Sequence, residues 1–123
     1  MTHRVSATYL IATLQDARAR TLELVNDLDQ EQLMGPKLPG VNPLRWEIGH
    51  IAYFYEFFIL RSLYGHDSIL GLKADELYDS IAVAHDTRWD LPLLSMTETL
   101  TYMNDVLEKV CAHLVNNNED GLA

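Results

Sequence analysis

The chain has 123 residues, enough for one domain with one hydrophobic core. Its apolar content of 48% is ordinary for a globular protein, and its net charge of −9 argues against binding to nucleic acid or to an anionic membrane surface, since both need clustered Lys and Arg. No N-terminal signal pattern is visible, and the single cysteine, Cys111, allows no internal disulfide, so we expect a reducing, cytoplasmic setting.

The first predicted element is an amphipathic helix over residues 6–28, in which apolar side chains recur every three or four positions. Ser6 is a suitable N-cap, because its hydroxyl can accept a hydrogen bond from a free backbone N–H. Residues 29–34 are expected to add a short turn. Residues 35–40 hold two prolines and two glycines, which predicts a loop.

The second predicted helix covers residues 42–64, with Asn42 as its N-cap, Pro43 at its first position and Gly65 at its stop. Apolar residues lie around most of its circumference, so we expect it to be buried on most sides or to lie in an interface. A membrane span is set aside because polar and charged residues interrupt the run: Arg45, Glu47, His50, Glu56 and Arg61.

One polar side chain in this helix, His50, stands among aromatic residues. Trp46 and Phe54 are one turn away on its face, and Glu47 is also within one turn. A half-buried imidazole needs a partner, so two interpretations stay open. His50 is either a core histidine satisfied by the protein or a metal ligand or catalytic base.

Residues 65–94 hold no long periodic run, and only 73–80 suggests a short helix, with Leu77 and Tyr78 turned inward. A long irregular connection in a compact domain is usually functional or disordered, and this one is too rich in apolar residues to be disordered. Part of it has the residue types of a ligand-facing loop: His85, Asp86, Arg88 and Trp89. The alternative is a surface loop held in place by Trp89 and Leu91.

The last predicted helix opens with a capping box formed by Ser95 and Glu98. Cys111 is interpreted as a small packed residue rather than a reactive thiol. His113 lies off the apolar seam and is expected to be solvated, and residues 116–121 form a polar tail. The seam follows alternating spacings of three and four: Leu100, Met103, Leu107, Val110 and Leu114.

Three long helices predict an all-α bundle. Such bundles normally have four helices, so the fourth must come from sequence outside these residues or from a partner chain, which favours a homo-oligomer. No Gly-rich phosphate loop, nucleophile elbow, Cys-x-x-Cys or His-x-x-x-His pair is present. A catalytic non-haem metal commonly needs about three protein ligands, and only His50 is well placed here.

Two separated motifs resemble a known family. Pro43-Leu44-x-Trp46-Glu47-Ile48-Gly49-His50-Ile51, with Glu56-Phe57-Phe58-Ile59-Leu60 behind it, is similar to the second helix of the DinB-like domain of ergothioneine-biosynthesis sulfoxide synthases. Leu77-Tyr78-Asp79-Ser80 and Arg88-Trp89-Asp90-Leu91-Pro92-Leu93 resemble the loop that follows in those proteins. The detail at residues 83–89 is closer to the selenoneine synthase branch. The likeness runs from about residue 7 to residue 115.

The resemblance implies a DinB-like up-down four-helix bundle joined to a C-terminal formylglycine-generating-enzyme-like domain. In that family three histidines hold a non-haem Fe(II), and O₂ is used to join a sulfur or selenium donor to trimethylhistidine. His50 matches the first iron ligand, and Arg88 matches an arginine that binds the thiol donor. His85 stands where a second such arginine is expected, which favours a selenosugar donor. Trp89 lies in the same motif, and we group it with these substrate-binding candidates.

The departure from the family concerns the other two iron ligands, a His-x-x-x-His on the fourth helix. The chain stops at Ala123, before that helix would begin. We therefore expect residues 1–123 to be a single incomplete DinB-like domain, an N-terminal piece or a shortened relative, that is inactive alone. A stand-alone binding or dimerisation module without iron is the alternative. A different DinB-like enzyme, such as a thiol-dependent transferase, is a third, and the absence of a second ligand pair counts against it.

Overall fold

A computed structural model describes residues 6–116, and within that range the chain is helical and has no strand. The expected all-α class is confirmed. The predicted polar tail lies outside the described residues after Asn116. The elements in chain order are α1 (Ala7–Val25), α2 (Gln30–Met34), α3 (Leu44–Tyr55), the π-helix η1 (Glu56–Leu63), α4 (Leu72–Tyr78), the 3-10 turn η2 (His85–Thr87) and α5 (Met96–Asn116).

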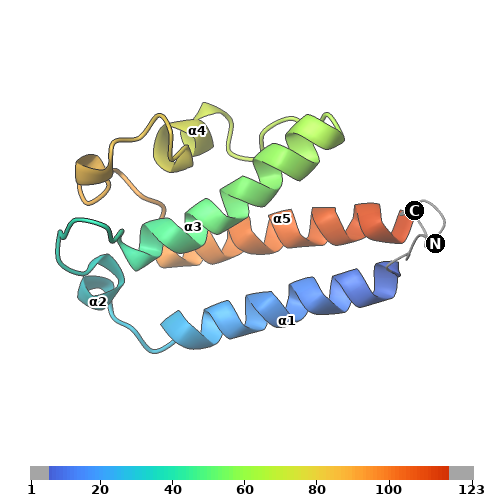
Figure 1. The fold of residues 1–123 in the computed structure, drawn as a ribbon, viewed down its shortest axis with the longest axis horizontal. Coiled ribbons are helices and arrows are strands. Elements are labelled where there is room, and N and C mark those ends of the chain that lie inside the picture. Colours follow the sequence, from blue (N-terminus) through green and yellow to red (C-terminus); the bar gives the residue numbers. More distant parts are fainter. Residues whose placement is uncertain (1–5, 117–123) are drawn as a thin grey trace.

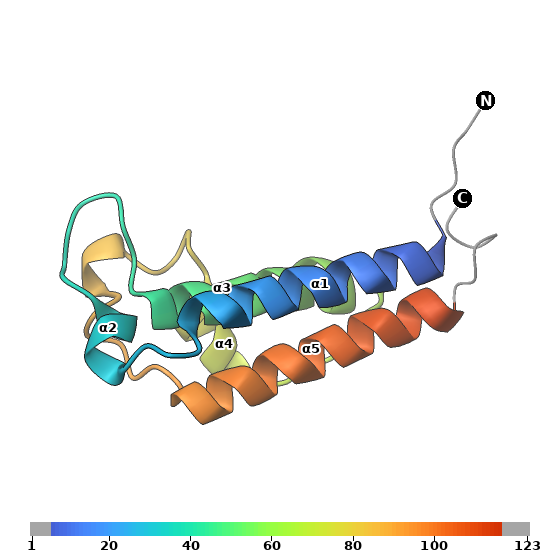
Figure 2. The same ribbon diagram turned by 90° about the horizontal axis from the view of Figure 1, so that it is seen from below.

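The three long helices pack side by side, with α5 in contact with both α1 and α3 (Figures 1 and 2). α3 begins at the end of the bundle that holds α2, and η1 continues it toward the opposite end (Figure 1). The connection through α4 and η2 then returns along the bundle, so α5 runs in the same direction as α3. Such a crossover allows two successive helices of a bundle to be parallel. It also places α4 against α3, where the candidate site lies.

Side-chain caps begin three of the helices. The Ser6 hydroxyl accepts from the Tyr9 N–H at 3.1 Å, and Ser95 and Glu98 form the expected reciprocal capping box, so both predictions are confirmed. Residues 29–34 were expected to form only a turn. They form α2, because an Asp-x-x-Gln capping box at Asp29 satisfies the free backbone groups at its start.

The buried face of α5 differs from the predicted seam. Met103 and Val110 are buried as expected, but Leu100 is 38% exposed. The seam is instead centred on Thr99, whose hydroxyl donates to the Ser95 carbonyl 2.8 Å away, so that a polar residue packs in the core at little cost. The buried side chains of α5 are Thr99, Tyr102, Met103, Val106 and Val110.

Cys111, at the edge of this face, is half-buried. Burial raises the pKa of its thiol, which keeps the sulfur protonated and fits a packed rather than a reactive residue. His113 was expected to be solvated, and this is wrong. It is half-buried, because it lies against His66 and Tyr64 at the end of the bundle.

The start of α3 also differs from the prediction. Pro43 is the N-cap, without a side-chain hydrogen bond, and Asn42 does not cap the helix. The Asn42 side chain is engaged elsewhere, because its amide donates to Glu47 and its oxygen accepts from Arg88 at 2.9 Å. The end is as predicted, since Gly65 has a φ of +70° and stops the helix.

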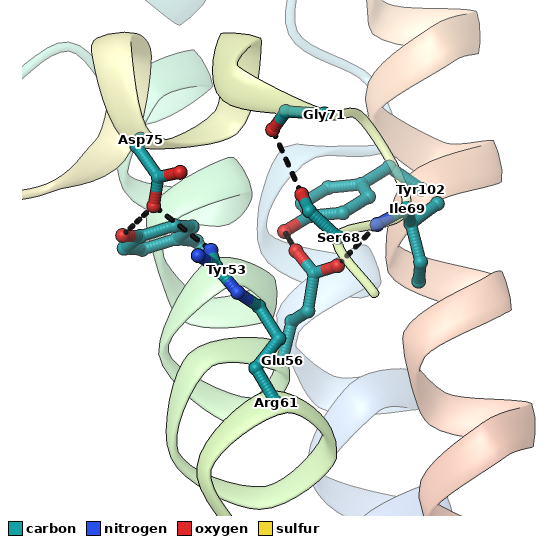
Figure 3. A network of polar contacts seen from close by, with 8 residues as sticks. All are labelled: Tyr53, Glu56, Arg61, Ser68, Ile69, Gly71, Asp75 and Tyr102. Carbon is teal, nitrogen blue, oxygen red and sulfur yellow. Dashed lines mark hydrogen bonds and ion pairs between the residues drawn. The ribbon is translucent and has the colours of Figure 1, made fainter. Parts of the chain in front are cut away.

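The second half of the predicted central helix is a π-helix, held by two carboxylates (Figure 3). Glu56 is fully buried, and its two oxygens accept from the Tyr102 hydroxyl at 2.5 Å and the Ile69 N–H at 2.6 Å. Asp75 of α4 accepts from Tyr53 and Arg61 at 2.6 and 2.8 Å. These bonds tie η1 and the end of α3 to α5 and α4. The π-helix was missed because the partners of Glu56, Ile69 and Tyr102, lie 13 and 46 residues away in the sequence.

One face of the central helix is left uncovered. Ile51, Phe54 and Phe58 are 39%, 53% and 54% exposed, and we call these three residues the exposed strip. The expectation of burial on most sides therefore holds for the faces toward α2, α4 and α5, and not for the exposed strip. An apolar groove lies nearby between α1, α3 and α5, with Ile51 at one of its walls. Within residues 6–116, no helix combines the length and apolarity needed to cross a membrane.

Candidate metal centre

His50 lies in the middle of α3, half-buried, and its ring is held on two sides. It stacks on the Trp46 indole, with ring centroids 4.5 Å apart, which confirms the expected aromatic neighbour. Its Nδ1 lies 2.8 Å from the carbonyl oxygen of Tyr78, at the end of α4. Because a carbonyl oxygen only accepts, Nδ1 must carry a proton, and Nδ1–H donates to Tyr78.

This hydrogen bond leaves Nε2 with its lone pair in the neutral ring. Nε2 makes no hydrogen bond within residues 6–116, and it is not a buried atom. His50 lines a cavity of about 230 Å³ whose walls include Phe54, Asp79 and Ile81. A histidine whose Nδ1–H is fixed by a carbonyl, with Nε2 open, has the arrangement found in metal-binding histidines. The ring is satisfied at Nδ1, as a core histidine would be, and it leaves Nε2 open, as a metal ligand would, so both interpretations stay open.

Tyr78 is positioned by the absence of a side chain at Gly49. A Cβ on Gly49 would lie 2.4–2.5 Å from atoms of the Tyr78 ring, so the ring occupies the space that a side chain would fill. Tyr78 is fully buried, with the rings of Trp46, Tyr53 and Tyr102 around it. Burial raises the pKa of its hydroxyl to about 12, so it stays neutral. This packing fixes the carbonyl that orients His50.

Arg88 reaches the same cluster from the connection after α4. Its guanidinium lies over the Trp46 ring at 4.1 Å, and its donors reach Asn42 at 2.9 Å and the carbonyls of Ser80 and Val83 at 3.1 and 2.8 Å. The side chain is only 8% exposed. Arg88 thus folds residues 80–88 against the start of α3, and Trp46 contacts both Arg88 and His50.

His85 and Trp89 contact each other edge to face, with ring centroids 5.1 Å apart. His85 donates through Nε2 to the Val41 carbonyl, and the Trp89 indole N–H donates to the Gly35 carbonyl at 3.2 Å. Both side chains therefore tie η2 to the loop before α3. Together with Arg88 they bond to their own chain here, and their predicted role in substrate binding stays a prediction.

Sequence reasoning missed the partner that orients His50, because that partner is a backbone carbonyl 28 residues away. Gly49, an isolated glycine inside a helix, was the available signal, since such a glycine often marks a close approach. Asp79, Ser80 and Ile81, which wall the cavity, were also not singled out as site residues. Within residues 6–116, no group of three or more His, Cys, Asp or Glu side chains is placed to hold a metal ion. That His50 is a metal ligand therefore stays a prediction.

Comparison with known proteins agrees with this architecture. Residues 13–123 match the model of the family described as the DinB superfamily. The chain belongs to the DinB superfamily. The match includes all of the central helix, the connection after it and α5, and so every residue of the cluster around His50.

Among curated proteins, this DinB chain is similar to three hercynine oxygenases. It is 34% identical to that of Mycobacterium tuberculosis (strain ATCC 25618 / H37Rv) over 113 residues, covering 91% of the chain and 26% of the relative. It is also 34% identical to the hercynine oxygenases of Mycolicibacterium thermoresistibile and Mycolicibacterium smegmatis, covering 90% and 85% of the chain and 25% and 24% of the relatives. The chain thus spans about a quarter of the length of the curated relatives it matches.

Proposed function

We propose that this DinB domain contributes His50 as one iron ligand to an enzyme of the hercynine oxygenase type, acting in ergothioneine or selenoneine formation. The observation that carries the proposal is the state of the His50 ring: Nδ1–H is held by the Tyr78 carbonyl, and Nε2 stays open beside a cavity. Similarity to three hercynine oxygenases supports the reaction class.

The residues present fit an iron site as one part of it. Neutral imidazole suits Fe(II), and the carbonyl hydrogen bond raises the basicity of the open nitrogen. When bound, Fe(II) would supply O₂ activation for joining a sulfur or selenium donor to trimethylhistidine. The remaining ligands, a His-x-x-x-His in the family, would come from a helix beyond these residues. We therefore propose that residues 1–123 are inactive on their own.

The chain's own contribution is the orientation of the His50 ring. Trp46 fixes the plane of the His50 ring, and the Tyr78 carbonyl fixes its tautomer. Phe54, Phe57 and Phe58 form an apolar wall of the cavity beside the open nitrogen. A nitrogen of fixed orientation is what a metal ligand requires.

The proposal for the donor molecule concerns the loop that carries Arg88, His85 and Trp89. Arg88 closes residues 80–88 over Trp46, and this segment includes Ser80 and Ile81 of the cavity wall. We propose that this loop binds the donor. The histidine at position 85, in place of a second arginine, favours a selenosugar over an anionic thiol.

A chimera tests the proposal. The matching quarter of the Mycolicibacterium thermoresistibile hercynine oxygenase is replaced by this chain, and iron content and hercynine-dependent O₂ consumption are measured. We expect about one iron per chain, lost in His50→Ala. The matched control is Ile51→Ala, the next residue on the same helix, which should keep the iron. A folded His50→Ala chimera with undiminished iron would contradict the proposal.

A second candidate function is a helical dimerisation module without iron, and the exposed strip favours it, because contiguous exposed apolar residues usually mark interfaces. Light scattering at micromolar concentration separates the two. A dimer that is disrupted by Phe54→Glu would favour the module. A monomer would remove this candidate.

A further inference from the structure

A pair of histidines meets at the end of the bundle farthest from α2. His66 follows the end of η1, and His113 lies in the last turn of α5. Their Nε2 atoms are 2.6 Å apart, and their rings cross at 77° with centroids 4.8 Å apart. Both side chains are half-buried. The pair is separate from His50, which precedes the end of η1 by about 20 Å of helix.

The surrounding structure holds the ring of His113 and the backbone of His66. The His113 ring stacks on Tyr64, with centroids 3.7 Å apart and planes 10° from parallel. The backbone of His66 is held because its N–H donates to the Leu60 carbonyl at 2.8 Å, beside the bond from Gly65 to Arg61. Two imidazoles from distant elements thus present the same nitrogen to one point in the folded chain.

The two Nε2 atoms are close enough to share a proton. At 2.6 Å one Nε2 must carry a proton and donate it to the lone pair of the other. Replacing that proton by a metal ion needs both lone pairs, so the donating ring must shift its proton to Nδ1. With metal–nitrogen bonds of about 2.0–2.1 Å and tetrahedral angles, the two nitrogens would stand roughly 3.3 Å apart. The rings would separate by about 0.7 Å, which side-chain rotation at two element ends can supply.

We propose that His66 and His113 form a two-histidine binding site for a late first-row transition-metal ion, for which Zn²⁺ is the probe. Imidazole nitrogen suits zinc, copper and nickel, while Mg²⁺ and Ca²⁺ prefer oxygen. The net charge of −9 favours cation binding in general. Within residues 6–116 no third His, Cys, Asp or Glu side chain joins the pair, so these residues supply two ligands.

Such an ion would join the turn after η1 to the last turn of α5. Since His66 and His113 are 47 residues apart in the sequence, the two ligands meet only in the folded chain. Binding therefore stabilises the folded state by mass action. The consequence is a zinc-dependent rise in melting temperature that depends on both histidines.

The test uses the 123-residue chain, titrated with Zn²⁺ by calorimetry and melted with and without Zn²⁺. We expect wild type to bind one Zn²⁺ at this pair, with affinity lowered at least about tenfold by either His66→Gln or His113→Gln. His85→Gln is the matched control, a half-buried histidine in η2, and should bind like wild type. Mg²⁺ should leave the melting temperature unchanged. Unaltered affinity in both variants would overturn the proposal.

A second measurement needs no variant at the pair. In wild-type protein, the ring-proton NMR signals of His66 and His113 should shift on the first additions of Zn²⁺. His50→Ala should keep those shifts, which separates this site from the proposed iron ligand. Shifts confined to His50, or their disappearance in His50→Ala, would overturn the two-histidine site and leave the proposed function untouched.

Discussion

Gly49→Ala should change the free energy of unfolding through two effects of opposite sign, a gain in helix propensity and a loss from overpacking. Alanine is favoured over glycine in a helix interior by about 1 kcal/mol, which alone would stabilise the protein. The added Cβ, however, would lie 2.4–2.5 Å from two ring carbons and the hydroxyl oxygen of Tyr78, about 1 Å inside ordinary contact. Overpacking of a well-filled core costs about 1–3 kcal/mol.

The cost should fall at the upper end of that range, because Tyr78 cannot give way. The Tyr78 side chain is fully buried, and three aromatic rings surround it at centroid distances of 6.3–6.5 Å. Subtracting the helix gain, we expect Gly49→Ala to lower the free energy of unfolding by about 2 kcal/mol. Movement of Tyr78 would also displace the carbonyl that holds His50.

Urea denaturation followed by circular dichroism measures this difference, since a shifted midpoint at unchanged slope reports stability. The control is a double-mutant cycle with Tyr78→Leu, which removes the ring atoms in question. In that background Gly49→Ala should become neutral or stabilising. Stabilisation of the otherwise unaltered protein by Gly49→Ala would refute the reasoning, because it would show that the Tyr78 ring does not fill this space.

Three further predictions concern polar contacts. Tyr102→Phe should lower the free energy of unfolding by about 1–3 kcal/mol, because an oxygen of the fully buried Glu56 loses its donor. Burial alone would raise the pKa of Asp75, but its hydrogen bonds outweigh burial and keep the pKa below its usual value. Its stabilisation is therefore present above the unfolded-state pKa, about 3.9, and is lost as pH falls through the folded-state pKa, so Asp75→Asn should flatten the acid limb of a stability–pH curve. Arg88→Lys should cost about 2 kcal/mol and speed amide exchange in residues 80–88, since lysine lacks the planar fork of donors.

Exposed residues of the same types provide the controls. Tyr9→Phe and Arg20→Lys alter side chains that are largely in solvent, and each should change stability by less than about 0.5 kcal/mol. For the acid limb, Asp16→Asn is the comparison, since its ion pair with Arg20 is on the surface. Equal effects in a buried variant and its surface control would show that the buried contact contributes no more than an exposed one.

The helices were largely predictable because their signals are local. Ser6 and the Ser95–Glu98 box mark helix starts through bonds within one turn, and Gly65 marks a stop through a positive φ. Leu77 and Tyr78 were placed inward from the sequence, and both are buried. The failures lie where side chains bond outside their own helix. Asn42 was assigned a cap, but it binds Arg88 46 positions away.

In the candidate site, too, the sequence was enough for one part and only the tertiary structure gave the other. The sequence was enough to single out His50, since an imidazole among apolar residues stands out and the motif around it resembles a known one. Its orientation was not predictable, because the Tyr78 carbonyl approaches only after the crossover lays α4 against α3. The meeting of His66 and His113 has the same origin, and the sequence alone left His113 in solvent.

For this protein, the sequence by itself determined the helical class, most helix ends and the histidine that stands out in the central helix. Periodicity and capping act over three or four residues, so they can be recognised without a fold. Only the tertiary structure decided which nitrogen of His50 is open, that η1 is a π-helix around buried Glu56, and that α3 and α5 run in parallel. These features depend on contacts between residues far apart in the chain, and no local pattern encodes the partner.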